Sequence, residues 1–197
     1  MNCDLALTQD LCARLCHDLG GPLGGVTGAL DLIDQTPEAV EVAREGMEAL
    51  NWRLRLWRAV AGAGAGPMGR AEILQLLDGA HAGGRTRIDG TALAEAELPA
   101  DAARAVLAAA MLGAEALPRG GTVHLSGGPD GVRVRPEGRN AAWTEALAQE
   151  DAVAGRSSGP RGVLLPLLLC LAEAAGWRVL RPAPVPEGLD ALVLRAA

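Results

Sequence analysis

A histidine and an aspartate stand side by side near the start of the chain, at His17 and Asp18. An unperturbed imidazole has a pKa near ~6.5, so at neutral pH one of its ring nitrogens carries a free lone pair and can act as a nucleophile. A neighbouring carboxylate can fix the tautomer of the ring, or accept the proton that the ring gives up when it is modified. We therefore take His17 as the candidate nucleophile and Asp18 as its supporting acid or base.

Helical periodicity places His17 on an outer surface. Apolar residues recur at alternating steps of three and four, which predicts a helix with a heptad seam. The apolar positions are Cys12, Leu15, Leu19, Leu23, Val26, Leu30 and Ile33. In this register His17 falls at an f position, which faces solvent. The stripe of the helix that contains it consists of Asp10, Arg14, His17, Gly21, Gly24, Gly28 and Asp31.

This stripe is almost bare of side chains after His17, so a helix of a partner could lie close to it. Each glycine inside a helix costs about 1 kcal/mol relative to alanine, so we expect tertiary packing to offset the glycines. The alternative is that Pro22 breaks the helix near Gly20.

A second apolar block predicts a helical hairpin and, with it, a dimer. It follows the turn at Gln35–Pro37, where Thr36 could cap the new helix. Its apolar positions are Val40, Ala43, Met47, Leu50, Leu54, Trp57 and Ala61. Two helices cannot enclose a core by themselves, so we expect a second copy of the chain to complete a four-helix bundle about a twofold axis.

Changes in composition predict two domains. The hairpin takes residues 1–61, a glycine-rich segment at 62–69 (GAGAGPMG) is typical of a flexible linker, and a second domain takes 70–197. In that domain we expect an α+β sandwich with helices on one face of a mostly antiparallel sheet. The predicted helices are 70–77, 100–117, 140–150 and 163–175, and the predicted strands are 86–88, 93–97, 122–126, 132–135, 178–181 and 189–195.

Composition and charge exclude several functional classes. The 197 residues carry a formal net charge of −6, which argues against a nucleic-acid partner because phosphate backbones demand a basic face. All 18 basic residues are arginine, and Phe and Tyr are absent, which we interpret as codon bias. We find neither a signal peptide nor an apolar run long enough for a membrane, so we expect a cytoplasmic protein with reduced cysteines.

Other motifs carry less weight. The segment Gly64–Gly69 matches a dinucleotide fingerprint, but it follows a helix rather than a strand. The segment Cys12–His17 resembles a widened haem-attachment sequence or a metal cluster, although core cysteines explain it better. His81 and His124 have no ligand or base pattern beside them in the sequence. A phosphate-binding Walker loop is excluded because the chain has no lysine.

The residues around His17 resemble the phosphorylated-histidine box of two-component signalling proteins, which reads His, acid, Leu, two variable residues, Pro, Leu. Here residues 17–23 read His-Asp-Leu-Gly-Gly-Pro-Leu. The longer segment from Ala13 is similar to that of ChpT-type bacterial histidine phosphotransferases, dimeric relay proteins with a helical hairpin and a degenerate kinase-like ATPase domain. Residues 115–122 (Glu-Ala-Leu-Pro-Arg-Gly-Gly-Thr) also resemble the helix-to-strand junction of the histidine-kinase ATP-binding domain.

This resemblance implies a phosphorelay. His17 would accept phosphate from the receiver domain of a hybrid histidine kinase and pass it to the receiver domains of response regulators. The receiver would supply Mg²⁺, and this chain would bind no cofactor. The candidate docking residues are Arg14, Asp10, Gly21, Gly24 and Gly28. Arg14 could pair with the phosphoryl group or with an acidic receiver surface, or it could be an ordinary surface arginine. Related boxes often have a polar residue where this chain has Gly21, so we expect weak phosphatase activity toward receivers.

The resemblance does not extend to ATP binding. Histidine kinases hold Mg-ATP with an asparagine on the helix that corresponds to 100–117, and this helix has none. No Asp-x-Gly-x-Gly segment occurs either, and the kinase lid is replaced by residues 155–162 (GRSSGPRG). We therefore expect no autokinase activity. The alternative to a relay enzyme is a non-catalytic scaffold or inhibitor that binds a kinase or receiver; an active ATP-dependent kinase is a third possibility.

Overall fold

The computed structural model describes residues 5–64, 66–144, 147, 162–183 and 189–197 as a chain of mixed helices and strands. The helices are α1 (Leu5–Asp31), α2 (Ala39–Ala61), α3 (Arg70–His81), α4 (Ala100–Glu115) and α6 (Leu164–Ala174). The strands are β1 (Thr86–Leu93), β2 (Gly121–Gly128), β3 (Gly131–Glu137), β4 (Trp177–Leu180) and β5 (Leu192–Ala196). The mixed α+β class predicted from the sequence is confirmed.

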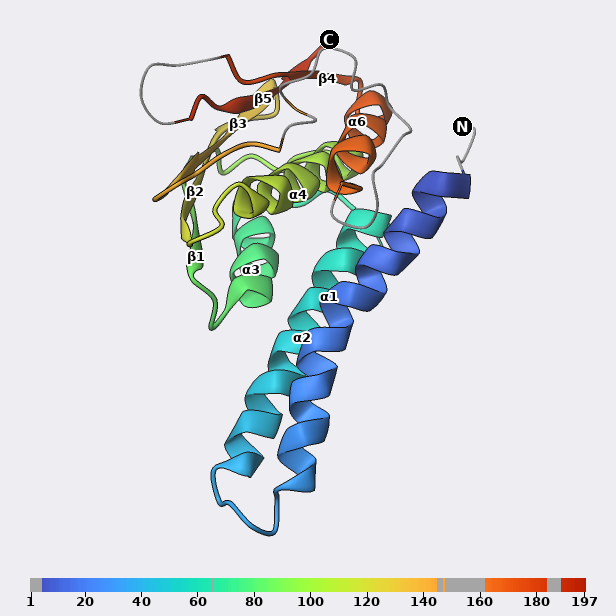
Figure 1. The fold of residues 1–197 in the computed structure, drawn as a ribbon. Coiled ribbons are helices and arrows are strands. Elements are labelled where there is room, and N and C mark those ends of the chain that lie inside the picture. Colours follow the sequence, from blue (N-terminus) through green and yellow to red (C-terminus); the bar gives the residue numbers. More distant parts are fainter. Residues whose placement is uncertain (1–4, 65, 145–146, 148–161, 184–188) are drawn as a thin grey trace.

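Helices α1 and α2 form an antiparallel hairpin that projects from the rest of the chain (Figure 1). Helix α1 continues through the glycines and Pro22, so the alternative of a break near Gly20 is wrong. The two helices approach closely at Gly46, where a Cβ would lie 2.7 Å from Cγ2 of Val26. Helix α2 ends at Gly62, which takes a left-handed conformation with φ of 85°.

The segment between α2 and α3 is held in place at Met68, contrary to the expectation of a flexible linker. Met68 is only 5% exposed. Its N–H donates to the carbonyl of Leu98 at 3.0 Å, and the N–H of Leu98 donates back at 2.9 Å. This two-way bridge satisfies the backbone groups that burial takes away from water, so the second half of the segment belongs to the folded part of the chain.

The five strands form one sheet in the order β1-β2-β3-β5-β4. Strands β1 and β2 run parallel and the other neighbours are antiparallel. Helices α3, α4 and α6 cover one face of the sheet (Figure 1). The strand predicted at 93–97 is wrong, because β1 runs on to Leu93 and the chain then leaves the sheet. Residues 140–144 of the predicted helix at 140–150 are not helical, and residue 147 is. The rest of this predicted helix and residues 155–161 lie outside the described residues.

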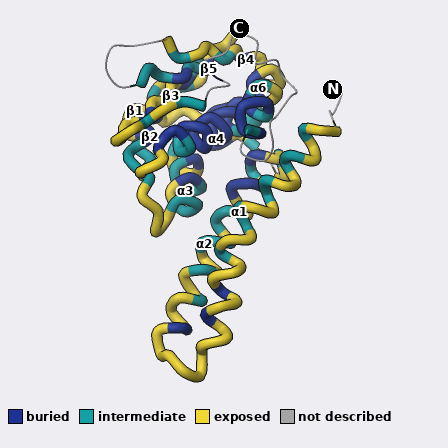
Figure 2. Tube along the Cα trace, viewed as in Figure 1, coloured by how far each residue is buried: buried dark blue, intermediate teal, exposed yellow. Residues whose placement is uncertain are grey.

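Helix α4 is the centre of the core. Most of its residues are buried, because the sheet covers one side and α2, α3 and α6 cover the others. Its many alanines let these neighbours approach closely. Figure 2 shows the buried residues concentrated in α4, α6 and the sheet, whereas the hairpin is largely exposed. Glu115 is the last residue of α4, so the core fixes the position of its backbone.

The predicted heptad seam of the hairpin is only partly buried. Val26 contacts the neighbouring helix, but large apolar side chains seven residues apart remain 42–53% exposed on both helices. We call them the apolar stripe: Leu23, Leu30, Val40, Met47 and Leu54. Among the described residues, no helix combines the length and apolar character needed to cross a membrane.

Candidate functional site

His17 lies on the outer surface of α1 with 67% of its side chain exposed. Its Nδ1 is 3.2 Å from Oδ1 of Asp18. An ionised carboxylate can only accept a hydrogen bond, so Nδ1 is the nitrogen that carries the hydrogen in this pair. The other ring nitrogen, Nε2, then has a free lone pair. The ring can therefore act as a nucleophile through Nε2 while it stays neutral.

Two further side chains donate hydrogen bonds to the carboxylate of Asp18. Nε of Arg14 lies 2.9 Å from Oδ1 and 3.0 Å from Oδ2. The indole Nε1 of Trp57, which is nearly buried on α2, donates to Oδ2 at 3.2 Å. The Asp18 side chain is 19% exposed. Charge-assisted hydrogen bonds from both sides restrict its rotation, so the orientation of Asp18 toward His17 is fixed by residues of both hairpin helices.

The backbone of Asp18 is also bound, and Pro22 is the reason. In a regular helix the N–H of residue 22 would donate to the carbonyl of residue 18, but proline has no N–H. Nη1 of Arg53, on α2, donates to this free carbonyl at 3.0 Å. The proline of the histidine box thus leaves an acceptor one residue after His17, and α2 satisfies it.

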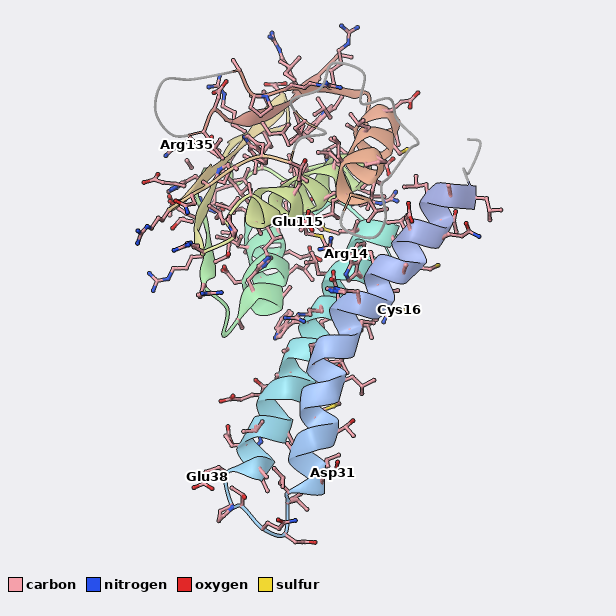
Figure 3. All side chains as sticks on the ribbon, in the orientation of Figure 1. Arg14, Cys16, Asp31, Glu38, Glu115 and Arg135 are labelled. Carbon is pink, nitrogen blue, oxygen red and sulfur yellow. The ribbon has the colours of Figure 1, made fainter. Side chains whose placement is uncertain are left out.

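Arg14 does not lie on the open surface where the heptad register places it. Its side chain is only 13% exposed, because it reaches back to α4 and donates from Nη1 to Oε1 of Glu115. Figure 3 shows Arg14 and Glu115 facing each other between the hairpin and α4. Burial lowers the pKa of Arg14, but the carboxylates of Glu115 and Asp18 outweigh it, and the pKa is raised overall.

The three glycines that follow His17 on the same face of α1 are exposed, as the heptad register predicts, but Asp10 is not. Asp10 is half-buried, and Gly21, Gly24 and Gly28 are exposed. A Cβ built on any of these three glycines would meet nothing within 4 Å. The packing that we expected to offset the glycines is therefore not supplied by the described residues of this chain, and the surface remains open.

Two cavities lie in the angle between the hairpin and the rest of the chain, and the larger one reaches the glycine surface at Gly21. One of about 290 Å³ lies beside Arg14, Asp18, Trp57 and Glu115. The other, of about 590 Å³, lies between the backbone of α1 and the loop that joins α3 to β1. Its lining includes Gly21, Pro22, Gly25, Gly83, Gly84 and Arg85. A partner on the glycine surface would therefore also meet this loop.

Sequence reasoning missed three contacts of Asp18 and its network. Trp57 was assigned only to the seam, and neither Arg53 nor Glu115 was singled out as part of the site. The spacing of Asp18 and Pro22 is a signal that could have revealed the free carbonyl, because the two residues are four apart. Nothing in the sequence could have revealed Glu115, which is 101 positions from Arg14.

The fold gives His124 acidic partners that its neighbours in the sequence do not supply. The parallel register of β1 and β2 places it beside Asp89, with Nδ1 3.0 Å from Oδ2. Its Nε2 lies 3.1 Å from Oε2 of Glu137, without the geometry of a hydrogen bond. His81 bonds through Nδ1 to the carbonyl of Leu77 in its own helix. Among the described residues, no group of three His, Cys, Asp or Glu could hold a metal ion.

The chain is similar to known proteins in two comparisons. Residues 70–184, which include α4 and Glu115, match the family model for the histidine phosphotransferase C-terminal domain. The solved structure of a bacterial phosphotransferase is similar over 98% of this chain and 97% of that one, with a TM-score of 0.79 and 21% sequence identity. At this identity the likeness shows a shared fold, and it includes the hairpin. No curated protein matches the chain.

Proposed function

Since the chain belongs to the histidine phosphotransferase family, we propose that it relays phosphoryl groups between receiver domains through His17. The donor is an aspartyl phosphate on the receiver domain of a hybrid histidine kinase, and the acceptors are aspartates of response-regulator receivers. One observation supports His17 above all: its side chain is 67% exposed, while Nδ1 is paired with Asp18. The family model begins at residue 70, so the assignment of His17 rests on this geometry and on the histidine box.

The transfer step follows from the tautomer. The lone pair of Nε2 forms a bond to the phosphorus, while the bond from phosphorus to the donor aspartate breaks and its electron pair leaves with the carboxylate. The ring then carries the phosphoryl group on Nε2 and the proton on Nδ1. Its positive charge is stabilised by Asp18. In the onward step an acceptor carboxylate attacks the phosphorus, and the electron pair of the N–P bond returns to Nε2.

We assign the Mg²⁺ chemistry of this step to the receiver and no ATP chemistry to this chain. Helix α4 corresponds by resemblance to the kinase helix that carries the ATP-binding asparagine, and it contains none. The chain's contribution is a nucleophile in a defined tautomer and a surface on which the receiver binds.

The proposed binding surface is the glycine face of α1. Because Gly21, Gly24 and Gly28 carry no side chains, the backbone of α1 is exposed on the C-terminal side of His17, and a receiver helix could approach it closely. The 590 Å³ cavity continues this surface to the loop between α3 and β1. Asp10 lies on α1 about two helical turns before His17. A receiver bound here would contact both the hairpin and the part of the chain that begins with α3, which we call the second part.

We also propose that two copies of the chain associate through the apolar stripe. Its five side chains repeat at intervals of seven on both helices, and each is 42–53% exposed in the single chain. Exposed apolar surface of this regularity favours a helical partner with the same pattern. The stripe lies on a different side of α1 from His17, so both phosphoacceptors of a dimer remain accessible.

The test is transfer of labelled phosphate from a phosphorylated hybrid-kinase receiver domain to the full-length chain. We expect acid-labile label on the wild type and none on the His17→Ala variant. A matched control is His124→Ala, which removes a partly exposed histidine of β2 that lines neither cavity and should leave labelling intact. Binding of receivers without labelling of the wild type would instead support the scaffold alternative.

A further inference from the structure

The orientation of Asp18 depends on a residue outside the hairpin. Arg14 binds Asp18 with Nε and Glu115 with Nη1, so one guanidinium joins the carboxylate beside His17 to the end of α4. The guanidinium is rigid and planar, and fixing one edge therefore limits the positions open to the other. Glu115 is placed by the most buried helix of the chain.

We propose that Glu115 is a positioning residue for the phosphoacceptor. Acting through Arg14, it holds Asp18 in the orientation that keeps the proton on Nδ1 of His17 and the lone pair on Nε2. The inference rests on the proposed role of His17 and gives the second part of the chain a task in the transfer step itself.

Charge supports this assignment as well as geometry. The carboxylates of Asp18 and Glu115 both bind the guanidinium of Arg14. Glu115 thereby offsets part of the positive charge that Arg14 places beside Asp18, so that Asp18 stabilises more strongly a ring that becomes positive when it takes up the phosphoryl group.

Burial strengthens the ion pairs of Arg14 with Asp18 and Glu115. The side chains of Arg14, Asp18 and Glu115 are 13%, 19% and 23% exposed, so water screens their interaction less than it screens a surface ion pair. Two other cationic or titratable side chains line the same cavity, Arg53 and His81. Their hydrogen bonds go to backbone carbonyls, Arg53 to Asp18 and His81 to Leu77, and not to the carboxylate of Glu115.

The test compares three variants of the full-length chain. Glu115→Gln keeps a hydrogen-bond acceptor for Arg14 but removes the charge, and Glu115→Ala removes both. The matched control is Glu173→Gln, the same change at an exposed position of α6. Three quantities are measured for each: the His17 tautomer from ring ¹⁵N chemical shifts, the single-turnover rate of phosphotransfer, and the affinity for an unphosphorylated receiver.

We expect the fraction of His17 with its proton on Nδ1 to fall in the order wild type, Gln, Ala. The transfer rate should fall with it, by about tenfold in the Gln variant. An acid or base such as Asp18 typically contributes ~10²–10⁴-fold to a rate, and Glu115 acts only indirectly, through Asp18. Receiver affinity and the control variant should be unchanged. A tautomer equal to that of the wild type in a folded Gln variant would overturn the inference, even if the rate fell.

The tautomer readout separates this inference from the relay proposal. If no receiver labels the wild type, the relay fails, and the ¹⁵N shifts still decide whether Glu115 orients His17. If the Ala variant does not fold, the Gln variant, which has the same shape as glutamate, decides the question.

Discussion

Asp18 accepts hydrogen bonds from both hairpin helices and offers its remaining capacity to His17. In the Asp18→Asn variant one side-chain oxygen becomes an NH₂ group, which cannot accept from Arg14, Trp57 or Nδ1 of His17. We expect the proton of the ring to move toward Nε2 and the transfer rate to fall by about 10²–10⁴-fold. Single-turnover transfer from a phosphorylated receiver measures it.

The control for this change is Asp31→Asn, at the exposed end of the same helix. It carries the same loss of charge and should transfer phosphate at the wild-type rate. An Asp18→Asn variant that matched this control would show that the carboxylate does not assist His17.

At the scale of the elements, we expect a substitution in the glycines of α1 to stabilise the fold and at the same time to weaken receiver binding. Gly24→Ala adds a methyl group that meets nothing within 4 Å in the chain, so it should raise the free energy of unfolding by about 1 kcal/mol. If the glycine face is the receiver surface, the same methyl group should weaken receiver binding. Chemical denaturation and calorimetric titration measure the two effects, and binding at wild-type affinity would move the receiver surface elsewhere.

The pairing of β1 with β2 predicts a dependence on pH. The N–H and hydroxyl of Thr91 and the ring of His124 bind Asp89 and lower its pKa. A lowered pKa in the folded chain means that the ionised group stabilises it above the unfolded pKa of about 3.9, and that this contribution disappears as pH falls through the folded value. Asp89→Asn should therefore lower the Tm at pH 5, with a difference from wild type that shrinks below about pH 4.

Thermal unfolding of both proteins across this range tests the sign. Asp34→Asn, in the exposed turn of the hairpin, serves as the control and should follow the wild type at every pH. A difference for Asp89→Asn that grew on acidification would contradict the assignment.

Local patterns predicted the helices well and the strands less well. Heptad spacing located α1, α2 and the outward position of His17, because a helix is specified by neighbours three and four residues apart. The strand at 93–97 was predicted wrongly, since a short apolar run does not show where β1 leaves the sheet. The position of Arg14 was also wrong, because the register gives the direction of a side chain but not the distant carboxylate of Glu115 that draws it inward.

At the scale of the whole molecule, the apolar stripe predicts a dimer that a single charge can dissociate. Met47→Glu would bury an unpaired carboxylate between two hairpins, at a cost of roughly 3 kcal/mol, and should raise the dimer Kd by about a hundredfold. Val42 offers a matched control, because it is equally exposed on α2 but lies off the stripe, and Val42→Glu should remain dimeric. Sedimentation equilibrium distinguishes these outcomes, and a monomeric wild type would refute the dimer.

The site as a whole could be predicted only in part. The nucleophile and its neighbouring carboxylate are consecutive in the chain, so their chemistry can be predicted from the residue types alone. Apart from Arg14, the residues that fix Asp18 come from α2, and Glu115 of α4 acts on it through Arg14, so the network exists only in the folded chain. Their contribution depends on three-dimensional packing, to which a single sequence gives no direct access.

Pro22 has a consequence for how α1 opens. Because residue 22 supplies no N–H, the ladder of backbone hydrogen bonds is interrupted one residue after His17. The part of α1 before this point is anchored to α2 and α4 through Arg53 and Glu115, whereas the part that ends at Asp31 packs against α2 where Val26 meets Gly46. The two halves should therefore exchange their amide protons with solvent at different rates, the distal half faster. The far end of the hairpin can then fray and close again while the imidazole keeps its alignment.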